Sequence, residues 1–376
     1  MSRKKNLLDY LALTLFIMCM GLALSASLEY VTRATEREYL GQGIWVLSMA
    51  GLSLLALLLG RISRKCGQKM QPLPKNIVMI ALGAVLVGVG VYLRLWVIWN
   101  IPVEPDSDFE TYYRMANHLP NDTLMSAEGA VDRRYIALYP HTIGFPMLIL
   151  WPTFAIFGAS VRNALYANLV CSVISILLAG HIARRIAGRT GALVAVALMS
   201  PSHILFSNMV ATEPSFTMLI LLAADMMTSI LDRRKGSLYD AAPSRMLGVM
   251  ALLGIVLALA GAIRPMAVIL LAAYCVVQLC VTGDPMNEIR VEGARYATSQ
   301  PLVCIVLVLV CYLVTGSVIS RAISDIIGEQ PASGLYASGY NLMVGLNTQS
   351  NGLWNETDSE FFAQAYDATK SATGAH

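Results

Sequence analysis

Nine long apolar segments recur along the chain, and each can cross the roughly 30 Å hydrocarbon core of a bilayer. Backbone groups at that depth must bond within their own segment, which for apolar runs of this length means a helix. Only 14% of the residues are charged, whereas soluble domains carry about 25%. The sequence therefore predicts an all-α, polytopic integral membrane protein with spans at Tyr10–Leu28, Ile44–Leu59, Ile77–Trp99, Val161–Ala183, Gly191–Phe206, Ser215–Leu231, Leu247–Ala262, Met266–Val281 and Pro301–Ile319.

A tenth apolar stretch, Tyr139–Phe157, is interrupted by Pro140, Gly144, Pro146 and Pro152. Each proline removes a backbone donor, and the freed carbonyl must find another partner at membrane depth. We therefore expect this stretch to be interfacial or re-entrant rather than spanning.

The distribution of basic residues tests this topology, because Lys and Arg concentrate in short cytoplasmic loops. With a cytoplasmic N-terminus and nine spans, 17 of the 27 basic residues lie inside, and a spanning Tyr139–Phe157 would move Arg184 to Arg189 and Arg233 to Arg245 outside. The topology places Asn100–Tyr139 and Ser320–His376 outside the cytoplasm, in a multi-pass protein of the cell membrane. The first segment is predicted to be a retained helix, because it is longer than the apolar region of a signal peptide.

Three parts follow from this pattern. Residues 1–76 form an N-terminal two-helix hairpin with a basic cytoplasmic loop, residues 77–319 a membrane core with a large outer loop at 100–160, and residues 320–376 a polar outer segment. That segment ends without a clear final element, as a fragment or a short form of the protein would. With a net charge of only +3 and no nucleotide-binding fingerprint, no nucleic-acid partner or cofactor is predicted. No Cys or His cluster indicates structural zinc, and a requirement for a divalent metal ion stays open.

An acidic, aromatic stretch, "VEPDSDFETYYRMANHL", follows the third span. Ser107 and Glu110 match a capping box, which predicts a helix beginning at Asp108. Tyr112 lies on the apolar face of that helix, which we expect to rest on the outer leaflet. The helix dipole favours the ionised form of Asp108, which would suit a general base. Acidic residues are also common as simple caps at helix starts, and that alternative stays open.

Four stretches occur in an order that resembles membrane GT-C glycosyltransferases: "PDSDFETYYRMANHL", "YPHTIGFPMLILWPTFAIFG", "ASVRNALYANLVCSVISILLAGHIARRIAGRTGALVAVALMSP" and "NMVATEPSFTMLILL". The resemblance is greatest to the protein-mannosyltransferase-like and aminoarabinose-transferase-like group, and it covers about Ile77 to Ile319. It implies a GT-C helix bundle with juxtamembrane helices in the outer loop. It also implies a polyprenyl-phosphate sugar donor and transfer on the extracytoplasmic side.

The resemblance implies a catalytic acid at Asp108, with Tyr112 at the matching position four residues later, where it would contact substrate. The family often has a second acid directly after the first, but here that residue is Phe109, so Asp106 is the substitute candidate. Glu213, in "ATEPSF", matches a position where an acid enters the active-site cavity, although Pro214 beside it is also typical of a plain helix start.

The donor phosphate requires a cation, and the planar fork of Arg suits this role. Arg264, in "GAIRPMAV" between two spans, is the first candidate, and Arg94 inside the third span is the second. Either side chain could instead snorkel to lipid headgroups. His141 is a candidate substrate contact, with a plain polar role as the alternative.

The predicted function is a membrane glycosyltransferase. It would move a sugar from a polyprenyl-phosphate donor to a hydroxyl of an envelope glycan, lipid or protein, with membrane lipids around it. The alternative is a transporter or flippase of a lipid-linked sugar. The acidic cluster lies in a loop rather than at mid-membrane, which favours the enzyme.

Overall fold

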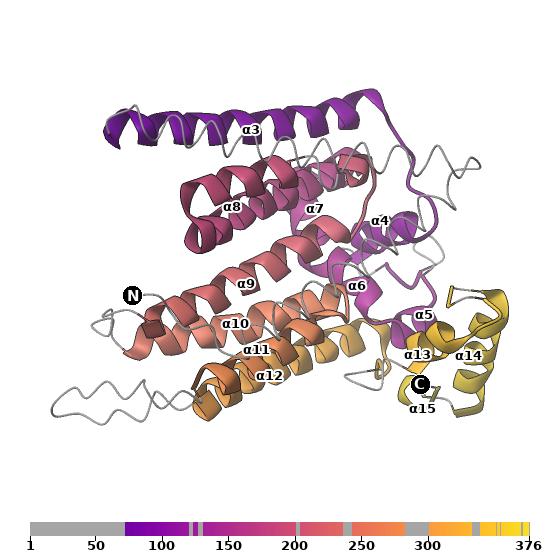
Figure 1. Ribbon diagram of the computed structural model, residues 1–376. Coiled ribbons are helices and arrows are strands. Elements are labelled where there is room, and N and C mark those ends of the chain that lie inside the picture. The colour runs from indigo at the N-terminus through magenta and orange to yellow at the C-terminus, as the bar shows by residue number, and fades with distance from the viewer. Residues whose placement is uncertain are drawn as a thin grey trace. The chain divides into compact units, whose positions relative to one another are not determined.

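The computed structural model describes residues 72–119, 123–126, 131–200, 204–235, 243–282, 301–332, 339–350, 352–353, 355–369 and 371–375. The chain divides into two units, Met1–Met79 and Ile80–His376. The predicted spans Tyr10–Leu28 and Ile44–Leu59 lie outside the described residues, as does most of the predicted hairpin. All regular secondary structure in the described part is helical (Figure 1), which confirms the all-α prediction.

Six long helices correspond to the seven predicted spans in the described residues. They are α3 (Pro72–Asn100), α8 (Val161–Met199), α9 (Glu213–Lys235), α10 (Pro243–Ile263), α11 (Ala267–Thr282) and α12 (Pro301–Ile327). Within the described residues, four segments are long and apolar enough to cross a membrane: Ile77–Asn100, Val161–Met199, Met246–Ile263 and Leu302–Ile327. Membrane-spanning character is therefore supported by the length and composition of these helices.

Helix α8 accounts for two predicted spans because it folds back on itself at Gly188. This glycine has a φ of 70°, which L side chains rarely adopt. The two arms approach so closely that a Cβ added to Gly180 would lie 2.8 Å from Cγ2 of Val196. The second arm ends at Met199, short of the predicted Phe206, and a 3₁₀ turn at Ile204–Asn208 follows.

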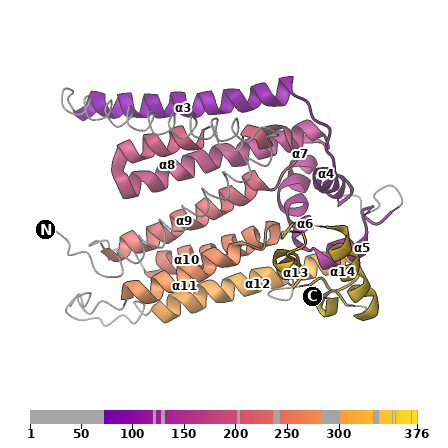
Figure 2. The ribbon, with the colours of Figure 1, turned by 45° about the vertical axis from the view of Figure 1, so that its right-hand side comes forward.

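The long helices of Ile80–His376 pack side by side, with α8 against α9, α9 against α10, and α10 against α12 (Figures 1 and 2). Small residues allow the closest approach, since a Cβ on Gly254 would lie 2.5 Å from the Val308 carbonyl oxygen. Met250, Leu253 and Leu257 of α10 are fully buried in the core. Outward-facing Val89 and Trp96 of α3 are half exposed, as lipid-facing side chains would be.

Shorter helices gather at one end of the long ones in both views. They are α4 (Asp108–His118), α5 (Arg133–Leu138), α6 (His141–Phe145) and α7 (Trp151–Phe157), with a π-helical turn at Pro146–Leu150. The interrupted stretch Tyr139–Phe157 is thus helical with a widened turn at Pro146, whose ring nitrogen cannot donate a hydrogen bond. Its place at the helix ends is consistent with the predicted interfacial position.

The C-terminal segment packs on α5 through α13 (Gly339–Leu346), α14 (Glu356–Thr369) and α15 (Ala372–Ala375). The ring of Tyr139, just after α5, lies 5.3 Å from that of Tyr340 and 5.8 Å from that of Phe362. Arg134 donates a 2.6 Å bond to the Ala363 carbonyl and lies 3.2 Å from Asp367. The tail therefore supports the outer loop.

Candidate functional site

Helix α4 begins at Asp108, as the sequence predicts, but the predicted capping box is wrong. Ser107 has a φ of 55° and makes no capping bond with its side chain. Asp106 accepts a 2.8 Å bond from the Ser107 amide instead. Glu110 lies 3.9 Å from Arg114 one turn along, an exposed pair of small energetic weight. Asp108 itself is exposed at the first turn, so its carboxylate is accessible.

The sequence predicted that the apolar face of α4 rests on the outer leaflet. In the structure this face packs on protein instead. Met115 and Ala116 are completely buried. The Tyr112 ring meets Phe145 edge-on at 5.9 Å, and Tyr113 meets Phe154 at 5.7 Å. The aromatic side chains of α6 and α7 thus cover the apolar face of α4, and they fix the position of Asp108.

A close contact joins α6 to the end of α10. A Cβ on Gly144 would lie 1.9 Å from the Ala262 carbonyl oxygen, so only glycine fits at this position. Helix α4 rests on α6 through Phe145, and α6 rests on α10 at Ala262, two residues before Arg264. This series of contacts positions the start of α4 relative to Arg264.

Arg264 and Glu213, both predicted from the sequence, form an ion pair through Nη2 and Oε1. Arg264 also donates from Nε to the Thr212 hydroxyl at 2.9 Å. Among the described residues these are its only side-chain hydrogen bonds and ion pairs, and its side chain is 37% exposed. The other carboxylate oxygen of Glu213, Oε2, is buried without a hydrogen-bond partner in the described part of the chain. The pair therefore retains donors and an acceptor for a ligand.

Tyr112 brings the predicted residues into one group. Burial raises the pKa of its phenol to about 12, with further raising by Asp108 and Glu213 and an opposing effect of Arg264. Burial, followed by Asp108 and Tyr112, raises the pKa of Tyr135 as well. We call Asp108, Tyr112, Tyr135, Glu213 and Arg264 the Tyr112 cluster. Four of its members were predicted from the sequence.

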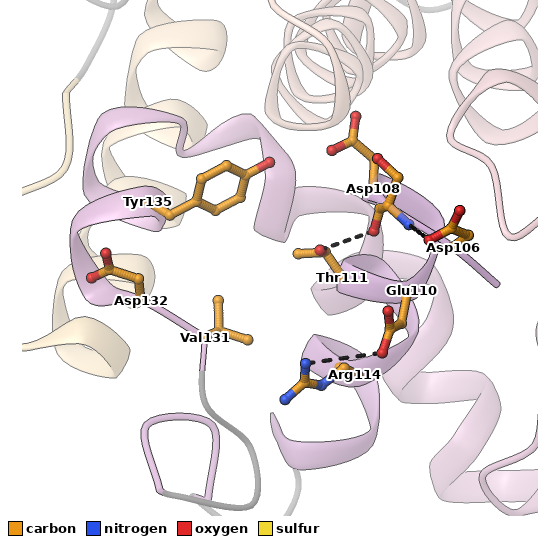
Figure 3. A pocket seen from close by; sticks show the side chains of 9 residues that line it. Asp106, Asp108, Glu110, Thr111, Arg114, Val131, Asp132 and Tyr135 are labelled. Carbon is orange, nitrogen blue, oxygen red and sulfur yellow. Dashed lines mark hydrogen bonds and ion pairs between the residues drawn. The ribbon is translucent and has the colours of Figure 1, made fainter. Parts of the chain in front are cut away.

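A cavity of about 580 Å³ opens beside the cluster, within the usual size range of small-molecule sites. Four of its nine lining residues are acidic, and in Figure 3 the Tyr135 hydroxyl and the Asp108 carboxylate point toward one another. The lining residues are Asp106, Ser107, Asp108, Glu110, Thr111, Arg114, Val131, Asp132 and Tyr135. Asp106 thus shares the cavity with Asp108 and remains the substitute candidate.

Two residues predicted for the site, Arg94 and His141, are not part of the Tyr112 cluster. Arg94 is 1% exposed and donates to the carbonyls of Gly90, at 2.9 Å, and Ser200, at 2.6 Å. Its positive charge is favourable at the C-terminal end of α8, but a guanidinium buried in this way offers nothing to a phosphate. His141 begins α6, and its ring meets the edge of Tyr139 at 6.4 Å.

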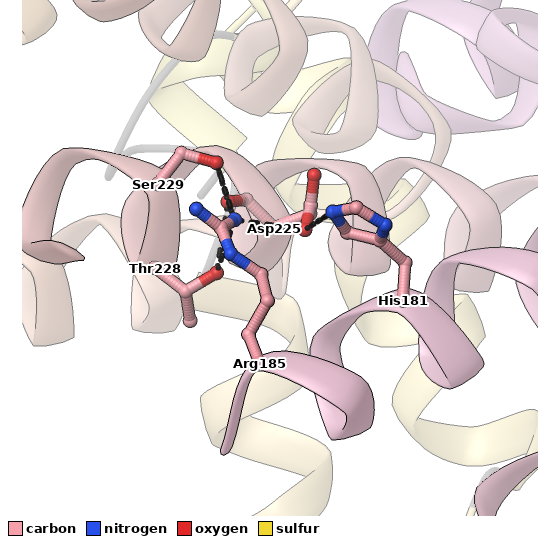
Figure 4. A network of polar contacts seen from close by, with 5 residues as sticks. All are labelled: His181, Arg185, Asp225, Thr228 and Ser229. Atoms are coloured by element: carbon pink, nitrogen blue, oxygen red, sulfur yellow. Dashed lines mark hydrogen bonds and ion pairs between the residues drawn. The ribbon is translucent and has the colours of Figure 1, made fainter. Parts of the chain in front are cut away.

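The sequence interpretation missed a polar group between α8 and α9 (Figure 4). Asp225 accepts from Arg185 at 3.2 Å, and its carboxylate lies 3.5 Å from His181 Nε2. Thr228 and Ser229 also accept from Arg185. Asp225 was hidden within an apolar run, and a single acid inside a predicted span is the signal that could have revealed it.

Thr212 was also missed, because a hydroxyl before a helix start reads as an ordinary cap. In the described residues, no three His, Cys, Asp or Glu side chains come together as metal ligands would. Comparison with protein-family models, curated proteins and solved structures finds no match to this chain. Any functional assignment therefore rests on the site itself.

Proposed function

We propose that the protein is a membrane glycosyltransferase. It would transfer a sugar from a polyprenyl-phosphate donor to an acceptor hydroxyl on the extracytoplasmic side. The observation that carries the proposal is that an accessible carboxylate, Asp108, and an arginine with an unbonded Nη1, Arg264, both lie near enough to Tyr112 to act on its phenol electrostatically. These are the two charges that such a transfer requires.

Asp108 is the proposed base. The acceptor oxygen attacks the anomeric carbon, the bond from that carbon to the phosphate oxygen breaks, and the acceptor proton passes to Asp108. The polyprenyl phosphate leaves with the electron pair. The cavity beside Asp108 would hold the acceptor, with the Tyr135 hydroxyl as a donor or acceptor toward it.

Arg264 would hold the leaving phosphate, where its guanidinium offsets the negative charge that develops. Glu213 was predicted at a position where an acid enters the active-site cavity, but its Oε1 is engaged by Arg264. We therefore assign Glu213 to orienting Arg264. Its buried Oε2 lacks a partner among the described residues and would accept a hydrogen bond from a donor-sugar hydroxyl.

The direct test is product formation in detergent. Purified protein would be incubated with a panel of polyprenyl-phosphate sugars and an acceptor extract from membranes. We expect a glycosylated product and one released polyprenyl phosphate for each sugar transferred. Release without a product, or neither across the whole panel, would contradict the proposal.

A second candidate is a transporter of a lipid-linked sugar, and the interhelical group at Asp225 favours it. Ionisable side chains between apolar helices often mark transport pathways. Translocation requires a sealed vesicle, whereas transfer proceeds in detergent. If Asp225→Asn abolished movement of a labelled lipid-linked sugar across proteoliposomes, and no product formed in detergent, the transporter would replace the enzyme.

A further inference from the structure

Thr212 lies directly before α9 and is 3% exposed. Its carbonyl accepts a 2.9 Å bond from the Ser215 hydroxyl and a 3.0 Å bond from the Phe216 amide. The backbone bond from Phe216 fixes this carbonyl at the start of α9, and it does not depend on the Ser215 hydroxyl. Its hydroxyl accepts from Nε of Arg264, 52 residues further along the chain.

A guanidinium is planar, so binding it at two nitrogens defines both its plane and its rotation. Thr212 binds Nε, and Glu213 binds Nη2. Nη1 has no partner among the described residues. If Glu213 were the single contact, the guanidinium could rotate about it, and Nη1 would have no fixed direction. The second contact removes that freedom before a ligand arrives, which lowers the entropic cost of binding.

We propose that Thr212 is a positioning residue, which orients Arg264 so that Nη1 faces the phosphate of the lipid-linked donor. This rests on the proposed function, because it takes Arg264 as the phosphate contact. Thr212 acts through Arg264 and does not touch the reacting atoms. The affinity for the phosphate, more than the rate of the chemical step, depends on its hydroxyl.

The experiment uses the full chain in detergent and dodecyl phosphate as the probe. Thr212→Val removes the hydroxyl at nearly constant volume, and Thr212→Ser restores it. Ser215→Ala is the matched control, because this buried hydroxyl bonds Thr212 and does not contact Arg264. Arg264→Gln marks the loss of the phosphate contact. Thr212→Ala replaces the valine variant if valine prevents folding.

We expect Thr212→Val to weaken dodecyl phosphate binding about three- to tenfold, because the freed guanidinium must then be ordered when the ligand binds. In the transfer assay the KM for the donor should rise by a similar factor while kcat changes less. Thr212→Ser and Ser215→Ala should stay within about twofold of the wild type in both measurements, because both keep the bond to Nε.

Wild-type affinity in Thr212→Val, or equal weakening in Thr212→Ser, would overturn the inference. If Arg264→Gln lost binding in the same series, the proposed phosphate contact would stand and only the role of Thr212 would fall. If Arg264→Gln bound dodecyl phosphate like the wild type, the phosphate contact and the inference would fall together.

Discussion

Gly144 offers a severe test of how the Tyr112 cluster is held together, because the substitution Gly144→Ala adds one methyl group at a backbone contact. The new Cβ would lie 1.9 Å from the Ala262 carbonyl oxygen and 2.5 Å from its carbon. Real Cβ contacts are almost never below 3.0 Å. Because both neighbours are backbone atoms, α6 and the end of α10 must separate by about 1 Å or more.

Two consequences follow from this shift. Overpacking of this kind costs about 1–3 kcal/mol, offset in part by the helix-forming advantage of alanine over glycine, about 0.5–1 kcal/mol. The net loss of up to about 2.5 kcal/mol should lower the unfolding temperature by a few degrees. The shift also moves Asp108 and Tyr112, carried by α6 through Phe145, relative to Arg264. A displacement of 1 Å in an active site can cost about 100-fold in rate.

The assay compares Gly144→Ala with Gly248→Ala, a position on α10 where an added Cβ meets nothing within 4 Å. Thermal unfolding and dodecyl phosphate binding would be measured in both variants, with sugar transfer as a third readout. We expect Gly248→Ala to match or exceed wild-type stability and to keep its activity. The reasoning would be refuted if Gly144→Ala were as stable and as active as that control.

Three further predictions concern other contacts. Tyr112 has a raised pKa, so its stabilising contribution is present below pH 10 and is lost as pH rises through about 12. Between these values the free energy of unfolding of Tyr112→Phe should therefore fall less steeply with pH than that of the wild type, and an unchanged pH profile would count against the cluster. Asp225→Asn and Arg185→Gln should each cost about 1 kcal/mol of the free energy of unfolding and should be non-additive in a double-mutant cycle, whereas additive losses would exclude coupling. Arg134→Gln should speed proteolysis at α13–α15, because it removes contacts with Ala363 and Asp367, and cleavage equal to that of an Arg133→Gln control would contradict this.

Hydropathy and proline patterns, each confined to one segment of the chain, predicted most of the helices. Long apolar runs predicted α3, α9, α10, α11 and α12 to within a few residues at most ends, because hydropathy alone determines which segments can cross a bilayer. The prolines of Tyr139–Phe157 predicted an interrupted stretch, which the widened turn at Pro146 confirms, while its non-spanning position stays a prediction. The start of α4 at Asp108 was also correct, although Asp106 rather than the Ser107 side chain binds the backbone there.

Contacts between distant segments could not be predicted in the same way. Nothing near Arg94 in the sequence shows that the carbonyl of Ser200, 106 residues away, will bind it. The same holds for the bond from Arg264 to Thr212 and for the burial of Met115 in one core with Ile323 and Phe362. For the site, residue types predicted Asp108, Tyr112, Glu213 and Arg264 as separate candidates, and only the packed fold brings them together.

The central claim is that Asp108 acts as the base in sugar transfer. Its most direct test is the initial transfer rate of Asp108→Asn relative to Glu110→Gln, which lies in the same turn and lines the same cavity. We expect the transfer rate of Asp108→Asn to fall about 100-fold or more while dodecyl phosphate binding is retained. The transfer rate of Glu110→Gln should stay within about threefold of the wild type. Equal rates for the two variants, or a fall confined to Glu110→Gln, would contradict this claim.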